Sequence, residues 1–154
     1  LYNYGYIKNF DKVETYELER YVPSLYESYS YVMASQKNYE ESIRYLYRAV
    51  ELKLATIKVI NLSKFEDYDD DEIEERNQID LFIESMQKSI LKNQKAIVEM
   101  YKPADNVYTK IMYIITLNNI GENEKAIQEF EQLKKLDIQS NLIDYTKSKL
   151  EEKK

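Results

Sequence analysis

Three aspartates at alternate positions are the residues in the sequence that most resemble a metal site. Asp67, Asp69 and Asp71 take the first, third and fifth positions of a helix-loop-helix calcium loop. The sixth position of such a loop needs glycine for a sharp turn and holds Glu72, and the twelfth needs a carboxylate and holds Gln78. We therefore expect no metal site, and we interpret the stretch as a solvated acidic loop that begins the next helix with negative charge.

The side chains that most enzymes use near neutral pH are missing. The 154 residues include no cysteine and no histidine, which removes disulfides, thiolate nucleophiles, zinc-finger spacings and the usual general base. No glycine-rich loop that would cradle a phosphate is present either. We expect a protein that is not an enzyme, with no catalytic residues and no cofactor.

The net charge of −6 comes from one stretch. Residues 66–84 contain ten acidic residues and one basic residue, and the rest of the chain is close to neutral. Nucleic acid binding needs a basic surface, so we expect no nucleic acid partner. No apolar run reaches the roughly 18 to 20 residues of a membrane span, so we expect no membrane insertion by this fragment.

The chain opens at Leu1 without a methionine, so we expect a fragment or a processed form whose upstream targeting or anchor segment is not seen. Localisation therefore stays open between cytoplasm and cell envelope. Abundant Lys, Asn, Ile and Tyr fit a bacterial genome rich in A and T.

The elements that must position any functional residue are predicted to be helices. Only 2 Gly and 2 Pro interrupt a chain that is 44% apolar and 32% charged, which indicates an all-α globular protein. We expect an N-terminal arm and a short helix in residues 1–22 and a single helical domain in residues 23–154. Tyr2, Tyr4 and Tyr6 alternate within that arm.

The stretch KNYEESIRYLYRAVELK, residues 37–53, predicts an amphipathic helix. Tyr39, Ile43, Leu46 and Val50 follow one another at spacings of four, three and four, which places them on one face. Pro23 predicts the start of a preceding helix. A break at residues 36–38 then gives a helix-turn-helix unit.

Residues 23–56 resemble the tetratricopeptide repeat, a helix-turn-helix unit of 34 residues. Ser30 stands at a small position of the first helix, and Ser42 and Ala49 stand where small residues let the two helices approach. The sequence departs from the family pattern at Lys37, where the turn glycine is missing, and at Leu54, where the final proline is missing. Nothing then stops the second helix.

Residues 107–140 resemble a second repeat of the same family. Gly121 is the turn glycine, Ala126 the first small residue and Phe130 the large aromatic residue. Leu133 stands where the second small residue belongs. Residues 138–152 predict a C-terminal capping helix.

A long antiparallel hairpin, residues 39–101, is predicted between the two repeat-like units. Residues 54–65 continue the helix of the first unit and are apolar on more than one face, so we expect two neighbours to bury them. Residues 73–101 predict a second helix, and each helix is about 40 Å long. Its expected seam is interrupted by Asn93 and Gln94 and consists of Ile79, Phe82, Ile83, Met86, Ile90, Ile97 and Tyr101.

The family resemblance implies a surface for a partner, formed mainly by the first helix of each repeat. The residues predicted to bind a partner are Tyr31, Tyr108, Ile111, Ile115, Asn118 and Asn119. Relatives that bind a terminal carboxylate use Lys, Arg and Asn there, whereas Glu27 and Tyr31 replace two of these groups here. An amphipathic helix or an extended peptide is therefore the expected ligand, unless the capping helix fills the surface itself.

Two functions follow from the sequence. The first is a non-enzymatic scaffold that docks a partner protein or peptide on a repeat-like surface. The alternative is a self-assembling structural protein that forms a homodimer through the long hairpin. The 16 tyrosines do not decide between the two, because Tyr31, Tyr45 and Tyr47 fit either an interface or packing against the hairpin.

Overall fold

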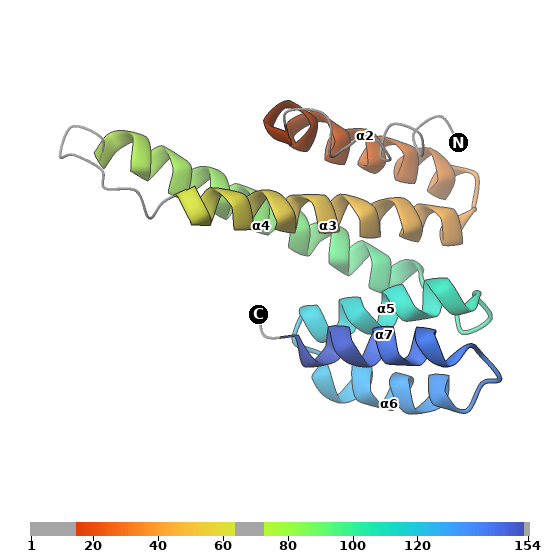
Figure 1. Cartoon of the computed structure of the whole chain (residues 1–154). Helices are drawn as coiled ribbons and strands as arrows, with labels where there is room; N and C mark the ends of the chain where they lie inside the picture. Colours follow the sequence, from red (N-terminus) through yellow and green to blue (C-terminus); the bar gives the residue numbers. More distant parts are fainter. Residues whose placement is uncertain (1–14, 64–72, 153–154) are drawn as a thin grey trace.

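The described part of the chain is all-α. The computed structural model describes the backbone of residues 15–63 and 73–152 and the side chains of residues 22–62 and 74–152. These ranges contain no strand and six helices: α2 (Thr15–Ser35), α3 (Tyr39–Ser63), α4 (Ile73–Met100), α5 (Val107–Asn119), α6 (Asn123–Lys134) and α7 (Ser140–Glu151) (Figure 1). The predicted fold class is confirmed. The predictions for Tyr2, Tyr4, Tyr6 and the aspartates of the acidic loop lie outside the described residues.

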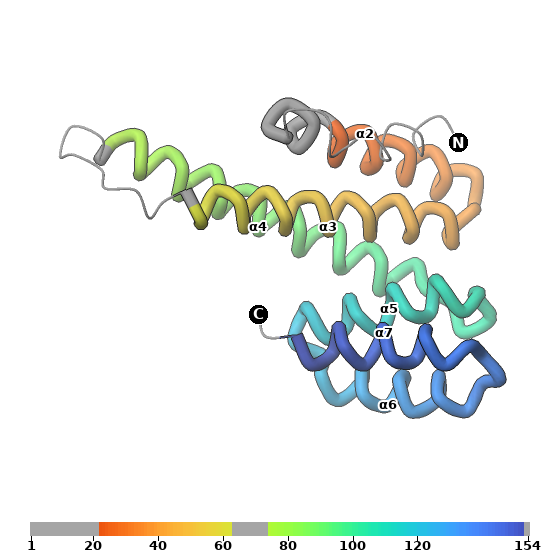
Figure 2. Tube along the Cα trace, viewed as in Figure 1, coloured from red at the N-terminus to blue at the C-terminus, as the bar shows by residue number. Residues whose placement is uncertain are grey.

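The hairpin of α3 and α4 is the longest unit of the molecule. The two helices have 25 and 28 residues and run antiparallel (Figures 1 and 2). α2 packs against α3, and α5 packs against α3, α4, α6 and α7. The helices α5, α6 and α7 form a block beside the end where α3 begins and α4 ends, so the other end of the hairpin projects beyond this block. The predicted hairpin is therefore confirmed.

The predicted helix start at Pro23 is wrong. α2 begins at Thr15, and Pro23 lies inside it. Proline lacks an N–H donor and usually breaks a helix interior. The residues on either side of it, Val22 and Tyr26, are buried against Ala49 and Leu52 of α3, so packing holds the helix together through this position. Tertiary contacts therefore override the local signal.

The two repeat-like units contain the same turn. The amide of Asn38 donates to Met33 O and that of Lys37 to Ala34 O, while Lys37 takes the left-handed conformation with φ 61°. Each of these residues has a counterpart 84 positions later. There Glu122 N donates to Leu117 O, Gly121 N donates to Asn118 O, and Gly121 has φ 94°. Lys37 thus takes the conformation that glycine adopts more readily.

The helix contacts also recur at this offset of 84 residues. Ser42 and Ala126 are both fully buried where the second helix of a unit approaches the first. Two further pairs are buried as well, Leu46 with Phe130 and Ala49 with Leu133. The second unit has a core of its own, in which Ile114, Leu117 and Leu133 are at most 1% exposed. The equivalence holds for packing as well as for sequence.

The seam of the hairpin follows the predicted stripe with one exception. Ile83 and Ile90 pack against Val50 and Ile57 of α3, with Ile79 and Met86 at the edge, and Ile97 packs against Ile43 and Leu46. Asn93 and Gln94 are buried among them. Tyr101 stacks on Tyr113 of α5 at 3.9 Å between ring centroids, and burial raises the pKa of Tyr101 to about 12. Phe82 is 49% exposed, because it lies one residue off the stripe.

Candidate partner-binding surface

The two tyrosines predicted to bind a partner are exposed but lie on separate helices. The side chain of Tyr31 on α2 is 77% exposed and that of Tyr108 on α5 is 63% exposed. α2 packs only against α3, and it makes no contact with α5. The two residues therefore do not belong to one continuous surface.

The two predicted isoleucines are part of the core. Ile111 is 5% exposed and Ile115 is 4% exposed, and both belong to the buried cluster of α5 and α6. Their side chains contact Tyr113, Leu117 and their neighbours in that cluster rather than solvent. A partner that docks on the folded chain cannot contact them, so we leave Ile111 and Ile115 out of the surface considered below.

The two predicted asparagines lie at the end of α5, next to the C-terminal helix. Asn118 and Asn119 are half-buried, and Asn118 Nδ2 donates to the carbonyl of Leu150 at 3.4 Å. α7 packs against α5 and α6, as the predicted cap requires. The capping helix therefore covers part of the surface that the family resemblance assigns to a partner.

Tyr108 borders a hollow of about 300 Å³ between the first turns of α3 and α5. Glu40 accepts hydrogen bonds there from the backbone N of Asn106 at 2.7 Å and from Asn106 Nδ2 at 3.2 Å. Asn106 in turn caps α5 by accepting from the backbone N of Thr109 at 2.9 Å. These polar groups bind one another, so the hollow mainly joins the hairpin to the C-terminal block.

A second hollow, of about 310 Å³, lies between α2 and α4. Lys53 of α3 is 7% exposed at its base, and its Nζ lies 2.5 Å from Glu27 Oε1 and 2.6 Å from Ser89 Oγ. One buried ammonium therefore connects three helices. Pro23 and Phe82 line the sides. The arrangement satisfies the lysine within the fold and offers no unpaired charge to a ligand.

The longest apolar face without a cover among the described helices is one side of the hairpin, which we call the underside. Tyr47 of α3 and Val98 of α4 pack against the core of α5 and α6 and so mark this side. Leu54 and Leu62 follow Tyr47 on the same face of α3, and Leu91 precedes Val98 by seven residues on α4. The underside is defined by Leu54, Lys58, Leu62 and Leu91.

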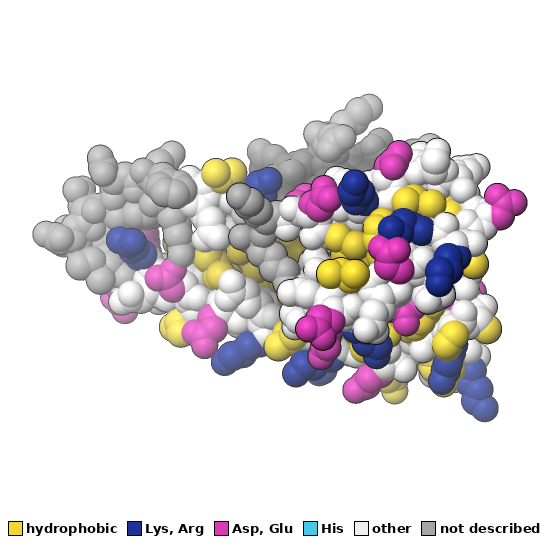
Figure 3. Space-filling model, turned by 90° about the horizontal axis from the view of Figure 1, so that it is seen from below, with side chains coloured by type: hydrophobic (Ala, Val, Ile, Leu, Met, Phe, Trp, Pro, Cys, Tyr) yellow, Lys and Arg dark blue, Asp and Glu magenta, His cyan; other side chains and the backbone are white. Residues whose placement is uncertain are grey.

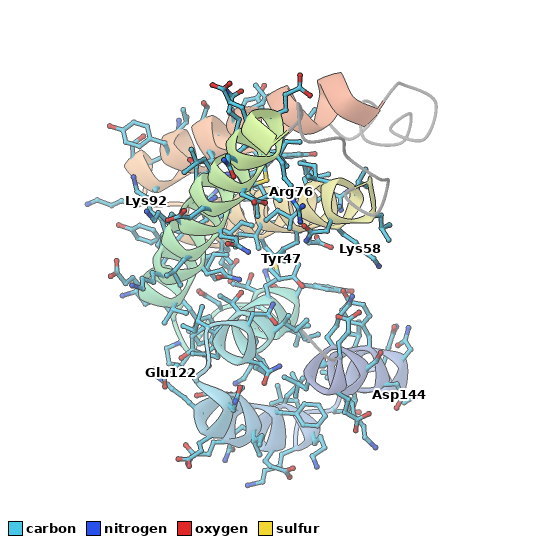
Figure 4. The ribbon with its side chains drawn as sticks, turned by 90° about the vertical axis from the view of Figure 1, so that its left-hand side faces the viewer. Tyr47, Lys58, Arg76, Lys92, Glu122 and Asp144 are labelled. Carbon is cyan, nitrogen blue, oxygen red and sulfur yellow. The ribbon has the colours of Figure 1, made fainter. Side chains whose placement is uncertain are left out.

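The leucines of the underside are well exposed. Leu54 is 44%, Leu62 63% and Leu91 41% exposed, although each continues a face that is buried nearer to α5. Hydrophobic side chains are visible on this side of the hairpin where it leaves the C-terminal block (Figure 3). Figure 4 shows Tyr47 and Lys58 extending from α3 toward the side on which α5 and α7 lie. The block thus ends before the apolar face does.

Charged and aromatic groups meet where the underside joins the C-terminal block. Burial, reinforced by the nearby carboxylate of Glu51, raises the pKa of Tyr47 well above its usual range, so its hydroxyl stays neutral next to Tyr145 of α7. Burial also raises the pKa of Glu51, although the cations of Arg48 and Lys149 oppose the shift. These side chains connect α3 with α7 at the inner end of the underside.

The sequence contained a signal for the underside that we interpreted differently. Residues 54–65 were expected to have two burying neighbours because they are apolar on more than one face. In the described residues the neighbours cover that segment only in part: Ile57 is buried, while Leu54, Val59 and Leu62 are 44 to 63% exposed. Apolar content reveals a face that can be buried, but it does not reveal whether this chain or a partner buries it.

Comparisons with protein-family models, with curated proteins and with solved structures found no match for the chain. Within residues 15–63 and 73–152, no three acidic side chains are grouped so that they could hold a metal ion. No helix in the same ranges is both long and apolar enough to cross a membrane.

Proposed function

We propose that the chain is a non-enzymatic interaction module, built from two tetratricopeptide-like units and a long hairpin, that docks a partner protein or an amphipathic peptide. The repeated turn and the repeated small-residue contact, each 84 positions apart, support the tetratricopeptide-like relationship of the two units. The absence of histidine and cysteine from the sequence is in keeping with a role in binding rather than in catalysis.

The observation that carries the proposal is the exposed apolar underside of the hairpin. Large apolar side chains gathered on one face of a soluble protein mark an interaction site. Leu54, Leu62 and Leu91 are each more than 40% exposed, and they stand on long helices that are fixed at one end by the core of the molecule. A rigid helical face of this kind presents the anchors that a partner helix needs.

Affinity purification from the source cells, combined with crosslinking, tests the function. Lys58 lies among the exposed leucines, so we expect a crosslink between its amine and a partner that the unchanged chain enriches. The double variant Leu54→Asp, Leu62→Asp should lose that partner while its circular dichroism stays helical. The proposal fails if no protein is enriched over an unrelated helical bait, or if the double variant retains the same proteins.

Self-assembly through the hairpin is the second candidate, and one observation favours it. Leu81 and Phe82 of α4 are 65% and 49% exposed, so the hairpin is apolar on further sides as well. Sedimentation of the purified chain over a wide concentration range separates the two functions. A monomer throughout supports the docking module, whereas a dimer that Leu81→Asp dissociates supports self-assembly.

A further inference from the structure

The arm that carries the underside is the most acidic part of the molecule. Residues 54–84 contain ten Asp and Glu against three Lys and Arg, while the rest of the chain contains 18 and 19. Three of these carboxylates are exposed on the described part of α4: Glu74 and Glu75 in its first turn and Glu84 two turns further along. The apolar face is therefore surrounded by a negative field.

We propose that the underside binds an amphipathic helix of another protein whose polar flanks are rich in lysine and arginine. This inference rests on the proposed docking function and names the chemistry of its partner. Leu54, Leu62 and Leu91 supply apolar contacts for one face of such a helix. The surrounding carboxylates attract its basic flanks, which speeds the encounter and selects against acidic helices.

The same charges argue against the other occupants of an apolar face. A second copy of the chain would bring another arm of net charge −7 against this one, and like charges across an interface are unfavourable. Nucleic acid and anionic lipid surfaces carry the same sign as the arm and are repelled in the same way. A basic partner helix satisfies both the apolar and the electrostatic character of the surface.

A pair of designed peptides tests the proposal directly. The probe is a labelled amphipathic helix of about 18 residues with leucines on one face and lysines on both flanks, and its control carries glutamates in place of the lysines. Fluorescence anisotropy with the full chain should show binding of the basic probe only. The affinity should fall at least about tenfold between about 50 and about 500 mM salt, because salt screens the attraction. Equal binding of both peptides, or no binding of the basic one, overturns the proposal.

Matched variants separate the underside from general attraction to an acidic protein. Leu62→Asp on the underside and Leu81→Asp, which lies off the underside on α4, add the same charge at side chains of 63% and 65% exposure. We expect Leu62→Asp to weaken the basic probe about tenfold or more, and Leu81→Asp to leave it within about twofold. Equal effects of the two variants would overturn the assignment of the underside.

The outcomes distinguish a failure of the partner chemistry from a failure of the function. A partner that crosslinks to Lys58 through an acidic or uncharged helix overturns this inference and leaves the docking function standing. A dimer of the chain that Leu62→Asp dissociates also overturns it, because the occupant is then a second copy. A partner that crosslinks to Lys58 through a basic amphipathic helix, and that Leu62→Asp releases, supports both.

Discussion

Two serines let α2 and α3 approach each other closely. Ser30 and Ser42 are buried, their hydroxyl oxygens are 2.6 Å apart, and each hydroxyl reaches the carbonyl of the other residue at about 3 Å. A small side chain is needed at this crossing because the two backbones are within hydrogen-bonding distance of these hydroxyls. Serine also satisfies its own polar atom there, which alanine would not need to do.

Substitution of Ser42 should separate the effects of size and of hydrogen bonding. Ser42→Ala removes one buried hydroxyl and leaves Ser30 its carbonyl acceptor, so we expect a loss of about 1 kcal/mol in the free energy of unfolding. Ser42→Leu has to push the helices apart and should cost about 1 to 3 kcal/mol more. Denaturant unfolding followed by circular dichroism measures both values.

The matched control for this prediction is Ser28→Leu on the exposed side of α2. It adds the same volume where no helix packs, and it should change the stability by less than about 0.5 kcal/mol. A Ser42→Leu protein as stable as the Ser28→Leu protein would show that the two helices are not in close contact in solution.

Single residues were predicted well from the sequence where local geometry decides their role and poorly where remote packing decides it. Ser42 and Ala126 were identified as small contact positions, and both are fully buried. Ile111 and Ile115 were assigned to an open surface by their register, yet α6 and α7 belong to the block that encloses their helix. Register fixes the direction of a side chain, whereas exposure depends on what packs there.

At the scale of elements, Lys53 connects α2, α3 and α4 through unequal partners. Its side chain is 9% exposed, while that of Glu27 is 33% exposed, so the ammonium is the more deeply buried member of the pair. Loss of one partner from a buried ion pair is costly because the other charge is left without compensation. The cost therefore depends on which of the two charges remains.

We expect Glu27→Ala to destabilise the protein more than Lys53→Met. The alanine variant leaves a buried ammonium with Ser89 as its remaining neighbour, at a cost of roughly 3 kcal/mol, whereas the methionine variant leaves a carboxylate that water can reach. Urea unfolding of both single variants and of the double variant gives the coupling between them. Equal losses, or a larger loss for Lys53→Met, would contradict this account of the pair.

The limits of most elements follow from sequence signals, and the exception has a physical cause. The breaks before Tyr39 and around Gly121 are local turns, and the predicted helices of the hairpin match α3 and α4 closely. Pro23 also gave a local signal, but α2 continues through it because Val22 and Tyr26 are buried on both sides. A single lost hydrogen bond is smaller than the packing that a continuous helix gains.

At the scale of the molecule, the two ends of the hairpin are stabilised differently. Near its fixed end, Ile43 and Ile97 are fully buried, and α2 and α5 pack on the same pair of helices. In the arm, by contrast, Leu62 and Leu81 are more than 60% exposed. Stability within one protein varies with the number of apolar contacts that must open.

This difference predicts a gradient of hydrogen exchange along α3 and α4. Amides of residues 54–62 and 74–86 should exchange at least about tenfold faster than those of residues 43–50 and 90–98, because the arm can open while the core remains folded. Mass spectrometry of deuterium uptake with overlapping peptides measures both sets in one sample. Leu54→Asp provides a control, since it should accelerate exchange little at a position that is already 44% exposed. Uniform rates along both helices would mean that the hairpin opens only with the whole molecule, and that its arm is as firmly held as its base.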